Sequence, residues 1–147
     1  MPPVNNLSEA RVVQVKADQL PQLNRFYRRN GHKGKACPED YAFWLEQKDT
    51  IVAAVRFSAY EQGLLMRGLW VHKALRGRGL GQQLLSGCQT FWKQQPCYCF
   101  PYAHLQGFYE RSGFTQAGNQ TPQSLKNQLR RYQQRGQDLI LMEYQPP

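Results

Sequence analysis

The chain has 147 residues, of which 41% are hydrophobic and 12% aromatic, and it carries a formal net charge of +9. This apolar content suits a single domain with one core and argues against a disordered chain. The longest apolar runs are far shorter than a membrane span, and the first residues lack the segments of a secretory signal, so we expect a cytoplasmic protein without membrane association.

The excess of basic residues favours anionic partners, among them cofactor phosphates, nucleic acid and acidic proteins. Net charge alone does not choose between them, and we favour cofactor attraction and solubility over dedicated RNA recognition. The four cysteines and three histidines show neither metal-ligand spacing nor a small disulfide framework, so we expect reduced thiols and no metal. We interpret Cys97 and Cys99, which share one face of an expected strand, as a structural pair.

The first part of the chain predicts a strand followed by a helix. Residues 10–16 alternate between apolar and polar side chains, as in a strand with one buried face. Asp18 is the expected N-cap of the helix, and Gly31 is its expected end. Between these two residues, apolar side chains recur at helical spacing: Leu20, Leu23, Phe26 and Tyr27.

The middle of the chain predicts three strands and a second helix. Residues 41–47 and 50–59 are expected to form a hairpin that turns at Lys48 and Asp49. Residues 64–72 are the next expected strand, which leads into a glycine-rich loop. The helix after this loop has its apolar side chains on one face: Leu80, Leu84, Leu85, Cys88, Phe91 and Trp92.

The last part of the chain predicts two strands around a short helix. Residues 97–102 are typical of a buried strand, and residues 139–144 of a final strand that completes the sheet. A short helix over residues 104–111 is expected to end at Gly113, with Phe114 in a hydrophobic contact at the helix end.

The segment between residues 118 and 138 is longer than a hairpin connection needs, and it predicts one more helix. Thr121 is the expected N-cap and Pro122 the expected first helical residue. The apolar face consists of Leu125, Leu129 and Tyr132. The polar face is basic, with Lys126, Arg130, Arg131 and Arg135 and no acidic residue before Asp138.

The glycine-rich loop, Arg76-Gly77-Arg78-Gly79-Leu80-Gly81, lies between an expected strand and an expected helix. Its glycines leave no side chain between the backbone and a ligand, so N–H groups at a helix N-terminus can bind a pyrophosphate. The dinucleotide-binding motif requires a glycine where Gln82 stands, and a P-loop requires Gly-Lys-Ser/Thr, so neither motif fits. Taken alone, the loop leaves a purely structural turn as an alternative.

Two motifs in this sequence resemble the GNAT superfamily of acyl-CoA-dependent N-acetyltransferases. The acyl-CoA loop of that family reads Arg/Gln-x-x-Gly-x-Gly/Ala after a strand that reads Leu-x-Val. The matching residues are Leu69, Val71, Arg76, Gly79 and Gly81. Lys73 replaces the usual proline, a departure that we expect to affect turn rigidity and not cofactor contacts. Residues 108–114, Phe-Tyr-Glu-Arg-Ser-Gly-Phe, resemble the second motif, Phe/Leu-Tyr-Glu-x-x-Gly-Phe.

The resemblance covers most of the chain and implies the GNAT fold of the α/β (α+β) class. This fold has a mixed, mostly antiparallel central sheet of six to seven strands flanked by about four helices. The basic helix between residues 118 and 138 would be an addition before the last strand. We therefore expect residues 1–147 to form a single GNAT acetyltransferase domain, as a monomer or a homodimer.

The resemblance also implies acetyl-CoA as the cosubstrate and a set of residues that bind it. In the family, main-chain groups of the strand hold the pantetheine arm and polarise the thioester carbonyl, while the loop binds the pyrophosphate. The corresponding cofactor-binding residues are Leu69, Trp70, Val71, Arg76, Gly77, Arg78, Gly79, Leu80 and Gly81.

Tyr109 matches the general acid of the family, because a phenol can donate a proton to the departing thiolate. The alternative is that Tyr109, between Phe108 and Phe114, is a core aromatic only. Many members place a glutamate on the strand before the loop, but Leu65 stands at that position here. Candidate bases in place of this glutamate are Glu61, His72 and His104, and none is assigned.

In the family the acceptor enters over the loop after the first helix and the connection before the last strand. Here these segments contain His32, Lys33 and Lys35, and the basic helix from Lys126 to Arg135. If they line the entrance, they favour an acidic small amine or acidic peptide; the alternative for the helix is a solvated face.

The resulting functional hypothesis is an N-acetyltransferase that transfers an acetyl group to a primary amine by direct attack in a ternary complex. One alternative is a non-catalytic acyl-CoA-binding sensor, which the missing strand glutamate permits. The other is a nucleic-acid-associated protein, either a tRNA-directed acetyltransferase or a binder, which rests on the net charge and the basic helix. The acceptor itself is not identified by any motif.

Overall fold

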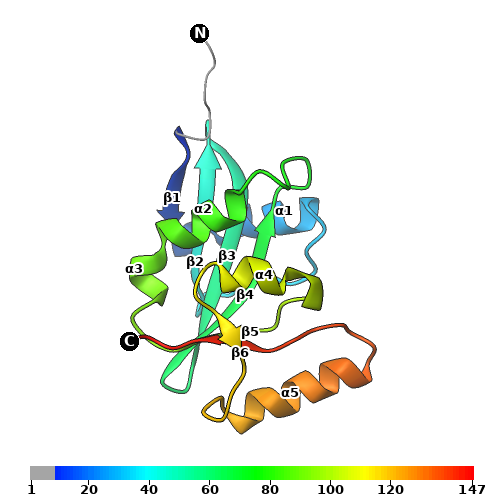
Figure 1. Cartoon of the computed structure of the whole chain (residues 1–147). Coiled ribbons are helices and arrows are strands. Elements are labelled where there is room, and N and C mark those ends of the chain that lie inside the picture. Colours follow the sequence, from blue (N-terminus) through cyan, green and yellow to red (C-terminus); the bar gives the residue numbers. More distant parts are fainter. Residues whose placement is uncertain (1–8) are drawn as a thin grey trace. The chain divides into compact units, whose positions relative to one another are not determined.

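The computed structural model describes residues 9–147. The strands are β1 (Arg11–Gln14), β2 (Tyr41–Gln47), β3 (Thr50–Tyr60), β4 (Gly63–Val71), β5 (Cys97–Cys99), β6 (Thr115–Gln116) and β7 (Met142–Tyr144). The α-helices are α1 (Leu20–Arg29), α2 (Leu80–Gly87), α3 (Gln89–Trp92), α4 (Gln106–Glu110) and α5 (Gln123–Gln134) (Figure 1).

The seven strands of the described residues form one sheet in the order β1-β2-β3-β4-β5-β7-β6. Strands β4 and β5 are parallel, whereas β1 and β2, β2 and β3, β5 and β7, and β6 and β7 pair antiparallel. The predicted mixed, mostly antiparallel α+β fold is therefore confirmed. Within residues 9–147, no helix has both the length and the hydropathy that crossing a bilayer requires.

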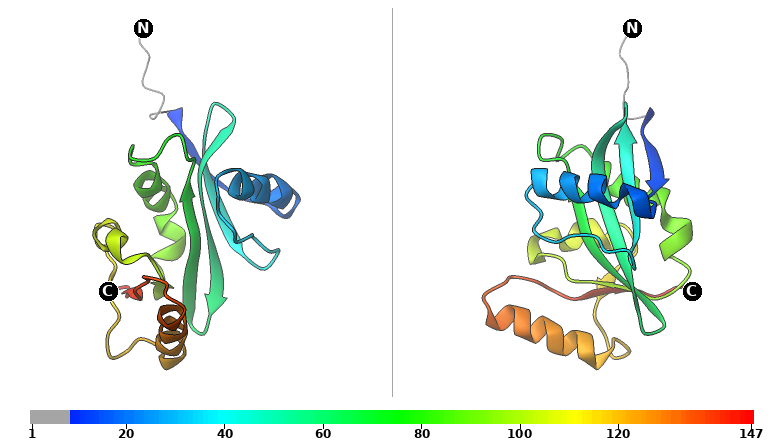
Figure 2. Two further views of the ribbon diagram at one scale, coloured as in Figure 1. Left: turned by 90° about the vertical axis from the view of Figure 1, so that its right-hand side faces the viewer. Right: turned by 180° about the vertical axis from the view of Figure 1, so that it is seen from behind.

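The chain divides into two compact units. The first contains the residues up to Ser58 together with Met66–Thr90, and the second contains Ala59–Leu65 together with Phe91–Pro147. In the first unit, α1 and α2 lie on opposite faces of the strands (Figure 2). Strand β3 is consequently covered on both sides, which explains its continuous burial from Ile51 to Phe57.

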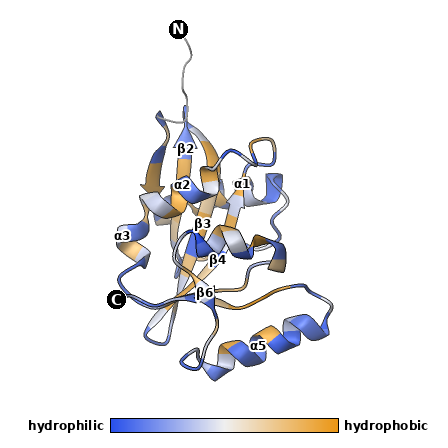
Figure 3. Cartoon of the chain, viewed as in Figure 1, coloured by the Kyte–Doolittle hydropathy of each residue, from blue (hydrophilic) through white to orange (hydrophobic). Residues whose placement is uncertain are grey.

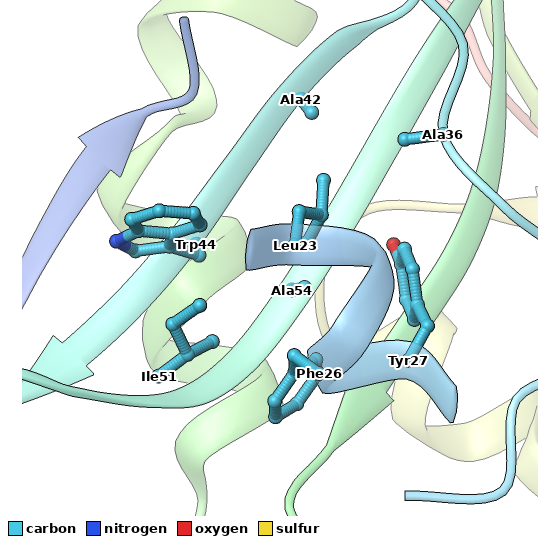
Figure 4. Packing of buried hydrophobic residues seen from close by; sticks show 8 residues of the cluster. All are labelled: Leu23, Phe26, Tyr27, Ala36, Ala42, Trp44, Ile51 and Ala54. Carbon is cyan, nitrogen blue, oxygen red and sulfur yellow. The ribbon is translucent and has the colours of Figure 1, made fainter. Parts of the chain in front are cut away.

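The apolar face of α1 builds the core on its side of the sheet. Leu23 and Tyr27 are fully buried, as the helical spacing predicts. They pack against strand residues whose side chains point to the same face (Figure 4). The complete cluster is Leu23, Phe26, Tyr27, Ala36, Ala42, Trp44, Ile51 and Ala54. Burial of each large apolar side chain contributes about 1.5–3 kcal/mol before entropy costs.

The hairpin between β2 and β3 turns where the sequence predicts. Lys48 and Asp49 have φ of 52° and 63°. Two consecutive left-handed residues are the backbone of a two-residue turn whose twist matches that of the flanking strands. Residues 41–47 and 50–60 pair antiparallel, with Gln47 opposite Thr50, so the hairpin prediction is confirmed with one additional residue at the end of β3.

In the second unit, α5 packs through its predicted apolar face. Leu125 is fully buried in a cluster with Leu65, Tyr98 and Leu141, and Leu129 packs against the same cluster. The Ser124 hydroxyl is hydrogen-bonded to the Tyr60 hydroxyl. The remaining surface of α5 is strongly hydrophilic (Figure 3), so this helix is anchored by a narrow apolar stripe.

The prediction of one continuous helix through Trp92 is wrong. Helix α2 ends at Gly87, and the short helix α3 follows. Ser86 and Gly87 are poor helix formers, and Gly87 lies against β1, where a Cβ atom would come within 2.4 Å of Val12 Cγ2. The close approach of α2 and β1 therefore requires glycine at position 87, and this glycine also weakens the helix.

The predicted C-terminal strands are longer than the observed ones. Strand β5 ends at Cys99, because Pro101 has no N–H group to continue the ladder. Strand β7 begins only at Met142. Between these regions, a single bridge joins Tyr102 and Leu139. The two-residue strand β6 was not predicted, because it is too short for a periodic pattern.

The two predicted helix N-caps, Asp18 and Thr121, are both wrong. Asp18 lies inside a 3₁₀ turn, Ala17–Gln19, whose N-cap is Lys16. Helix α5 begins at Gln123 with Pro122 as N-cap. The Thr121 hydroxyl instead donates to Glu143 Oε1 at 2.6 Å. A buried carboxylate without a hydrogen-bond donor costs more free energy than an exposed helix end without a cap.

Candidate active site

The glycine-rich loop leads from the end of β4 at Val71 to the start of α2 at Leu80. Gly77 and Gly79 have φ of +81° and +78°, in the left-handed region that favours glycine. A Cβ atom at either position would have no other atom within 4 Å. The loop backbone therefore faces open space on the side toward which Cβ atoms of these two residues would point.

The start of α2 provides backbone donors beside this open space. Gly79 is the N-cap, and no side chain caps the helix. The first intrahelical bond runs from Gln83 N–H to the Gly79 carbonyl at 3.0 Å, so the N–H groups before it have no partner within the helix. Together with the positive end of the helix dipole, these groups suit a pyrophosphate.

The two arginines of the loop differ in their surroundings. Arg76 Nε donates to the Val71 carbonyl at 3.2 Å, and its guanidinium lies 5.4 Å from the centre of the Trp70 ring. Arg76 therefore ties the loop back to β4. Arg78 is exposed and makes no hydrogen bond or ion pair with the described part of the chain, so its charge remains available for an anion.

Gly68 has a left-handed backbone conformation within β4, just before the predicted cofactor-binding residues of this strand. Its φ is +62°, and a Cβ atom would come within 2.2 Å of Arg56 Nη1 and 2.9 Å of the Tyr27 hydroxyl. The Tyr27 hydroxyl donates to the Gly68 carbonyl at 2.8 Å. Only glycine fits this place. The role of Gly68 was not predicted, although an isolated glycine inside a strand pattern is a known signal for irregular backbone.

Arg56 lies buried beside Gly68 and contacts His32, one of the predicted entrance residues, together with Asp40. Its Nη1 donates to His32 Nε2 at 3.0 Å, and its Nε lies 3.8 Å from Asp40 Oδ2. Because arginine only donates hydrogen bonds, His32 accepts at Nε2 and carries its proton on Nδ1. The His32 ring lies between Tyr27 and Trp70, with ring centres 4.5 and 4.7 Å away.

Burial, and then the neighbouring Arg56 charge, lower the pKa of His32 to about 4 from its ordinary 6.5. Between these two values the unfolded chain binds a proton that the folded chain does not, so we expect the free energy of unfolding to decrease as the pH falls through this window. The His32→Gln variant should show a flatter pH profile in denaturant titrations. The His104→Gln variant, which changes an exposed histidine, should keep the wild-type slope. Identical slopes for the wild type and both variants would show that His32 does not cause the pH dependence.

Tyr109 lies on α4 in the second unit and is buried, with 8% of its surface exposed. Its carbonyl accepts from Phe114 N–H at 3.1 Å, and the two rings are 5.8 Å apart. Gly113 has φ of +99°, so the predicted helix end at Gly113 with a Phe114 contact is confirmed. Burial, and secondarily Cys99, raise the pKa of Tyr109. The phenol therefore retains its proton at neutral pH.

A family model described as an acetyltransferase (GNAT) domain matches residues 39–116, which is more than half of the chain. The chain belongs to the GNAT acetyltransferase family. The matched range contains both the glycine-rich loop and the Phe108–Phe114 motif. The resemblance that the sequence motifs indicate is thereby confirmed at the level of the family.

Individual relatives of this GNAT protein are distant. Protein ElaA of Escherichia coli is 36% identical over 75 residues, or 46% of this chain and 49% of ElaA, so the match spans about half the length of this curated relative. Among solved structures, the ribosomal-protein-S18-alanine N-acetyltransferase from Escherichia coli has a TM-score of 0.68, 17% identity, and coverage of 92% and 93% of the two chains. Rv2747 from Mycobacterium tuberculosis, in complex with CoA, has a TM-score of 0.67, 14% identity, and coverage of 92% and 99%.

The position of the frequent GNAT glutamate is apolar in this protein. Leu65 has 3% of its surface exposed and packs against Tyr98 and Leu125. No proton can be accepted there. Of the candidate bases, His72 accepts the Ala74 N–H on Nδ1 at 3.1 Å, and Glu61 is exposed in the turn between β3 and β4. The third, His104, is exposed and stacks on Tyr102.

The cysteines lie in settings that disfavour nucleophilic chemistry. Cys88, Cys97 and Cys99 are buried and Cys37 is exposed, and all four are free thiols. Burial raises the pKa of Cys88 to about 12 and that of Cys99 well above its ordinary value, so both thiols stay protonated. Within residues 9–147, no three His, Cys, Asp or Glu side chains gather as metal ligands would.

Proposed function

We propose that this GNAT protein transfers an acetyl group from acetyl-CoA to a primary amine by direct attack in a ternary complex, with residues 1–147 acting as one acetyltransferase domain. The observation that carries the proposal is the open backbone at Gly77 and Gly79, beside the N–H groups at the start of α2, which have no partner within the helix itself. Family membership supports the same cosubstrate.

Acetyl-CoA supplies an activated acyl group, and the residues of the chain bind and orient it. The loop N–H groups hold the phosphates, and the Arg78 guanidinium adds positive charge next to them. Main-chain groups from Leu69 to Val71 bind the pantetheine arm. The Tyr109 phenol donates its proton to the sulfur as the carbon–sulfur bond breaks, so that CoA leaves as a neutral thiol.

The acceptor amine must lose a proton before or during the attack. Leu65 offers no carboxylate for this step, and the His72 Nδ1 atom is already hydrogen-bonded. We propose that the proton passes to solvent, either through ordered water or because the acceptor amine has a low pKa. The apolar Leu65 position equally supports the second candidate function, an acyl-CoA-binding sensor that has lost turnover.

The decisive experiment measures free-thiol release from acetyl-CoA with a panel of amino acids, polyamines, aminoglycosides, N-terminal peptides and tRNA. Acceptor-dependent release supports the transferase and names the substrate class. Measurable acetyl-CoA binding without release for any acceptor favours the sensor. Release or binding that requires tRNA and decreases steeply with salt favours the nucleic-acid-associated function.

The basic face of α5 leads us to propose an acceptor with negative charge. Arg130, Arg131 and Arg135 are exposed and make no ion pair with the described residues. The Arg130→Glu/Arg131→Glu variant should raise KM for an acidic acceptor by about tenfold, because two attractive contacts become repulsive, and should leave a neutral analogue unaffected. KM is measured by initial-rate thiol release.

The control for this charge reversal is Lys16→Glu/Arg28→Glu, which changes the net charge equally on the first unit. It should leave both KM values within about twofold of the wild type. If the α5 variant binds the acidic acceptor as well as the wild type does, the basic face of α5 is a solvated surface without a role in acceptor binding.

A further inference from the structure

A hollow of about 460 Å³ lies in the first unit, between α1, the start of β3 and the residues that follow β4. It is separate from the open face of Gly77 and Gly79, and none of the cofactor-binding residues that the motifs indicate lines it. Its volume falls within the range of small-molecule sites. It is large enough for a group the size of a mononucleotide.

The rim of the hollow is cationic. Arg25, Arg29 and Lys73 line it together with His72, and no acidic residue does. In the described part of the chain, the side chains of the two arginines and Lys73 make no ion pair or hydrogen bond. Arg25 and Arg29 are four residues apart on α1, where like charges repel and destabilise a helix. An anion between them would turn this repulsion into attraction.

The floor of the hollow is apolar. Phe26 and Ile51 line it and have 6% and 8% of their surfaces exposed. An apolar base below a few charged groups is the usual composition of a site for a ligand with an anionic part and a ring. A bare inorganic anion would use the rim and leave the floor without a partner.

One wall of the hollow is linked to the glycine-rich loop through Asn30, which is buried with 5% exposure. The Asn30 Oδ1 atom accepts from Lys73 N–H at 2.9 Å. The Asn30 carbonyl accepts from Trp70 Nε1 at 2.6 Å and from Arg76 Nη2 at 3.4 Å. A ligand in the hollow would therefore contact the same residues that hold the loop in place.

We propose that this hollow binds a phosphate monoester, with the phosphate between Arg25, Arg29 and Lys73 and the organic group over Phe26 and Ile51. The phosphate has two sources, the 3′-phosphate of coenzyme A or a separate nucleotide-like ligand. The first source rests on the proposed use of acetyl-CoA. The second does not depend on the proposed function.

The test is calorimetric titration of the whole protein with AMP, CoA and 3′-dephospho-CoA. The wild type should bind AMP saturably, and the Arg25→Gln/Arg29→Gln variant should bind it at least about tenfold more weakly. The matched control is Arg28→Gln, on the same helix and exposed but outside the hollow; it should stay within about twofold of the wild type. Since the double variant also removes a like-charge pair, its melting temperature should not fall.

The titrations also separate the two sources. If the 3′-phosphate of CoA occupies the hollow, CoA binds more tightly than 3′-dephospho-CoA, the difference disappears in the double variant, and AMP competes with CoA. If a separate ligand occupies it, AMP binds equally well in saturating CoA, and CoA affinity is the same in the double variant. Lys73→Gln provides an independent variant if the double variant does not fold.

Two results would overturn the site. One is the absence of saturable AMP binding together with equal affinity for CoA and 3′-dephospho-CoA. The other is an equal loss of binding in Arg28→Gln and in the double variant, which would indicate attraction by net charge alone. Neither result depends on turnover, so a failure of acetyl transfer and a failure of this site are distinguishable.

Discussion

The Tyr109→Phe variant is expected to lower kcat for amine acetylation by about 100-fold or more, with acetyl-CoA affinity within about twofold of the wild type. The substitution removes one hydroxyl and keeps the ring, so the contacts with Phe108 and Phe114 remain. The raised pKa of Tyr109 means that the hydroxyl carries its proton under assay conditions. Loss of this proton donor acts on the step in which the thiolate leaves and not on binding.

The effect of Tyr109→Phe is measured by steady-state thiol release with saturating acceptor and by calorimetric titration with acetyl-CoA. Tyr102→Phe is the matched control, because it removes the hydroxyl of an exposed tyrosine in the same unit, and it should retain wild-type kcat. A Tyr109→Phe enzyme with unchanged kcat would show that Tyr109 is a core aromatic, the alternative reading of the motif. Equal melting temperatures exclude a folding defect as the cause of a slow variant.

The Gly77→Ala/Gly79→Ala variant is expected to weaken acetyl-CoA binding by at least about tenfold. Both residues have left-handed φ, which costs a residue with a Cβ roughly 1–2 kcal/mol. An added methyl group meets no other atom in the loop, so the loop can relax to another conformation without disturbing the core. The relaxed loop then no longer directs its N–H groups toward one point. Affinity is measured by calorimetric titration with acetyl-CoA.

The matched control is Gly136→Ala. Gly136 follows α5 with φ of +83° and also has no atom within 4 Å of a Cβ. This variant carries the same backbone strain at the end of another helix, in the second unit, so it should lose some stability and bind acetyl-CoA like the wild type. If the loop variant retains wild-type affinity, the glycines form only a turn, and the proposed phosphate contacts are wrong.

The features that the sequence predicted correctly depend on neighbours along the chain. The turn at Lys48 and Asp49, the helix end at Gly113 and the glycine-rich loop each occupy a few consecutive residues, and backbone conformation there follows from the residues themselves. The amphipathic spacing of α1 and α5 likewise predicted their buried faces. Fold class followed from the family resemblance that the two motifs carry.

Two of the incorrect predictions fall where a distant contact overrides a local preference. Thr121 has the side chain of an N-cap, but it bonds to Glu143, which is 22 residues away. The helix after the loop has a continuous apolar face, but Gly87 ends it where β1 comes close. In both cases the energy of one tertiary contact exceeds the modest free energy of a cap or a helical turn.

By itself, the sequence determined the family, the loop with its left-handed glycines and the position of the tyrosine, because these depend on residue types at short spacing. Only the tertiary structure decided what surrounds them. It buried Leu65 at the position of the usual base, joined His32 to Arg56, and gathered Arg25, Arg29 and Lys73 around one hollow. Periodicity tells which face of an element is buried, but the partners across that face are set by packing between residues far apart in the chain.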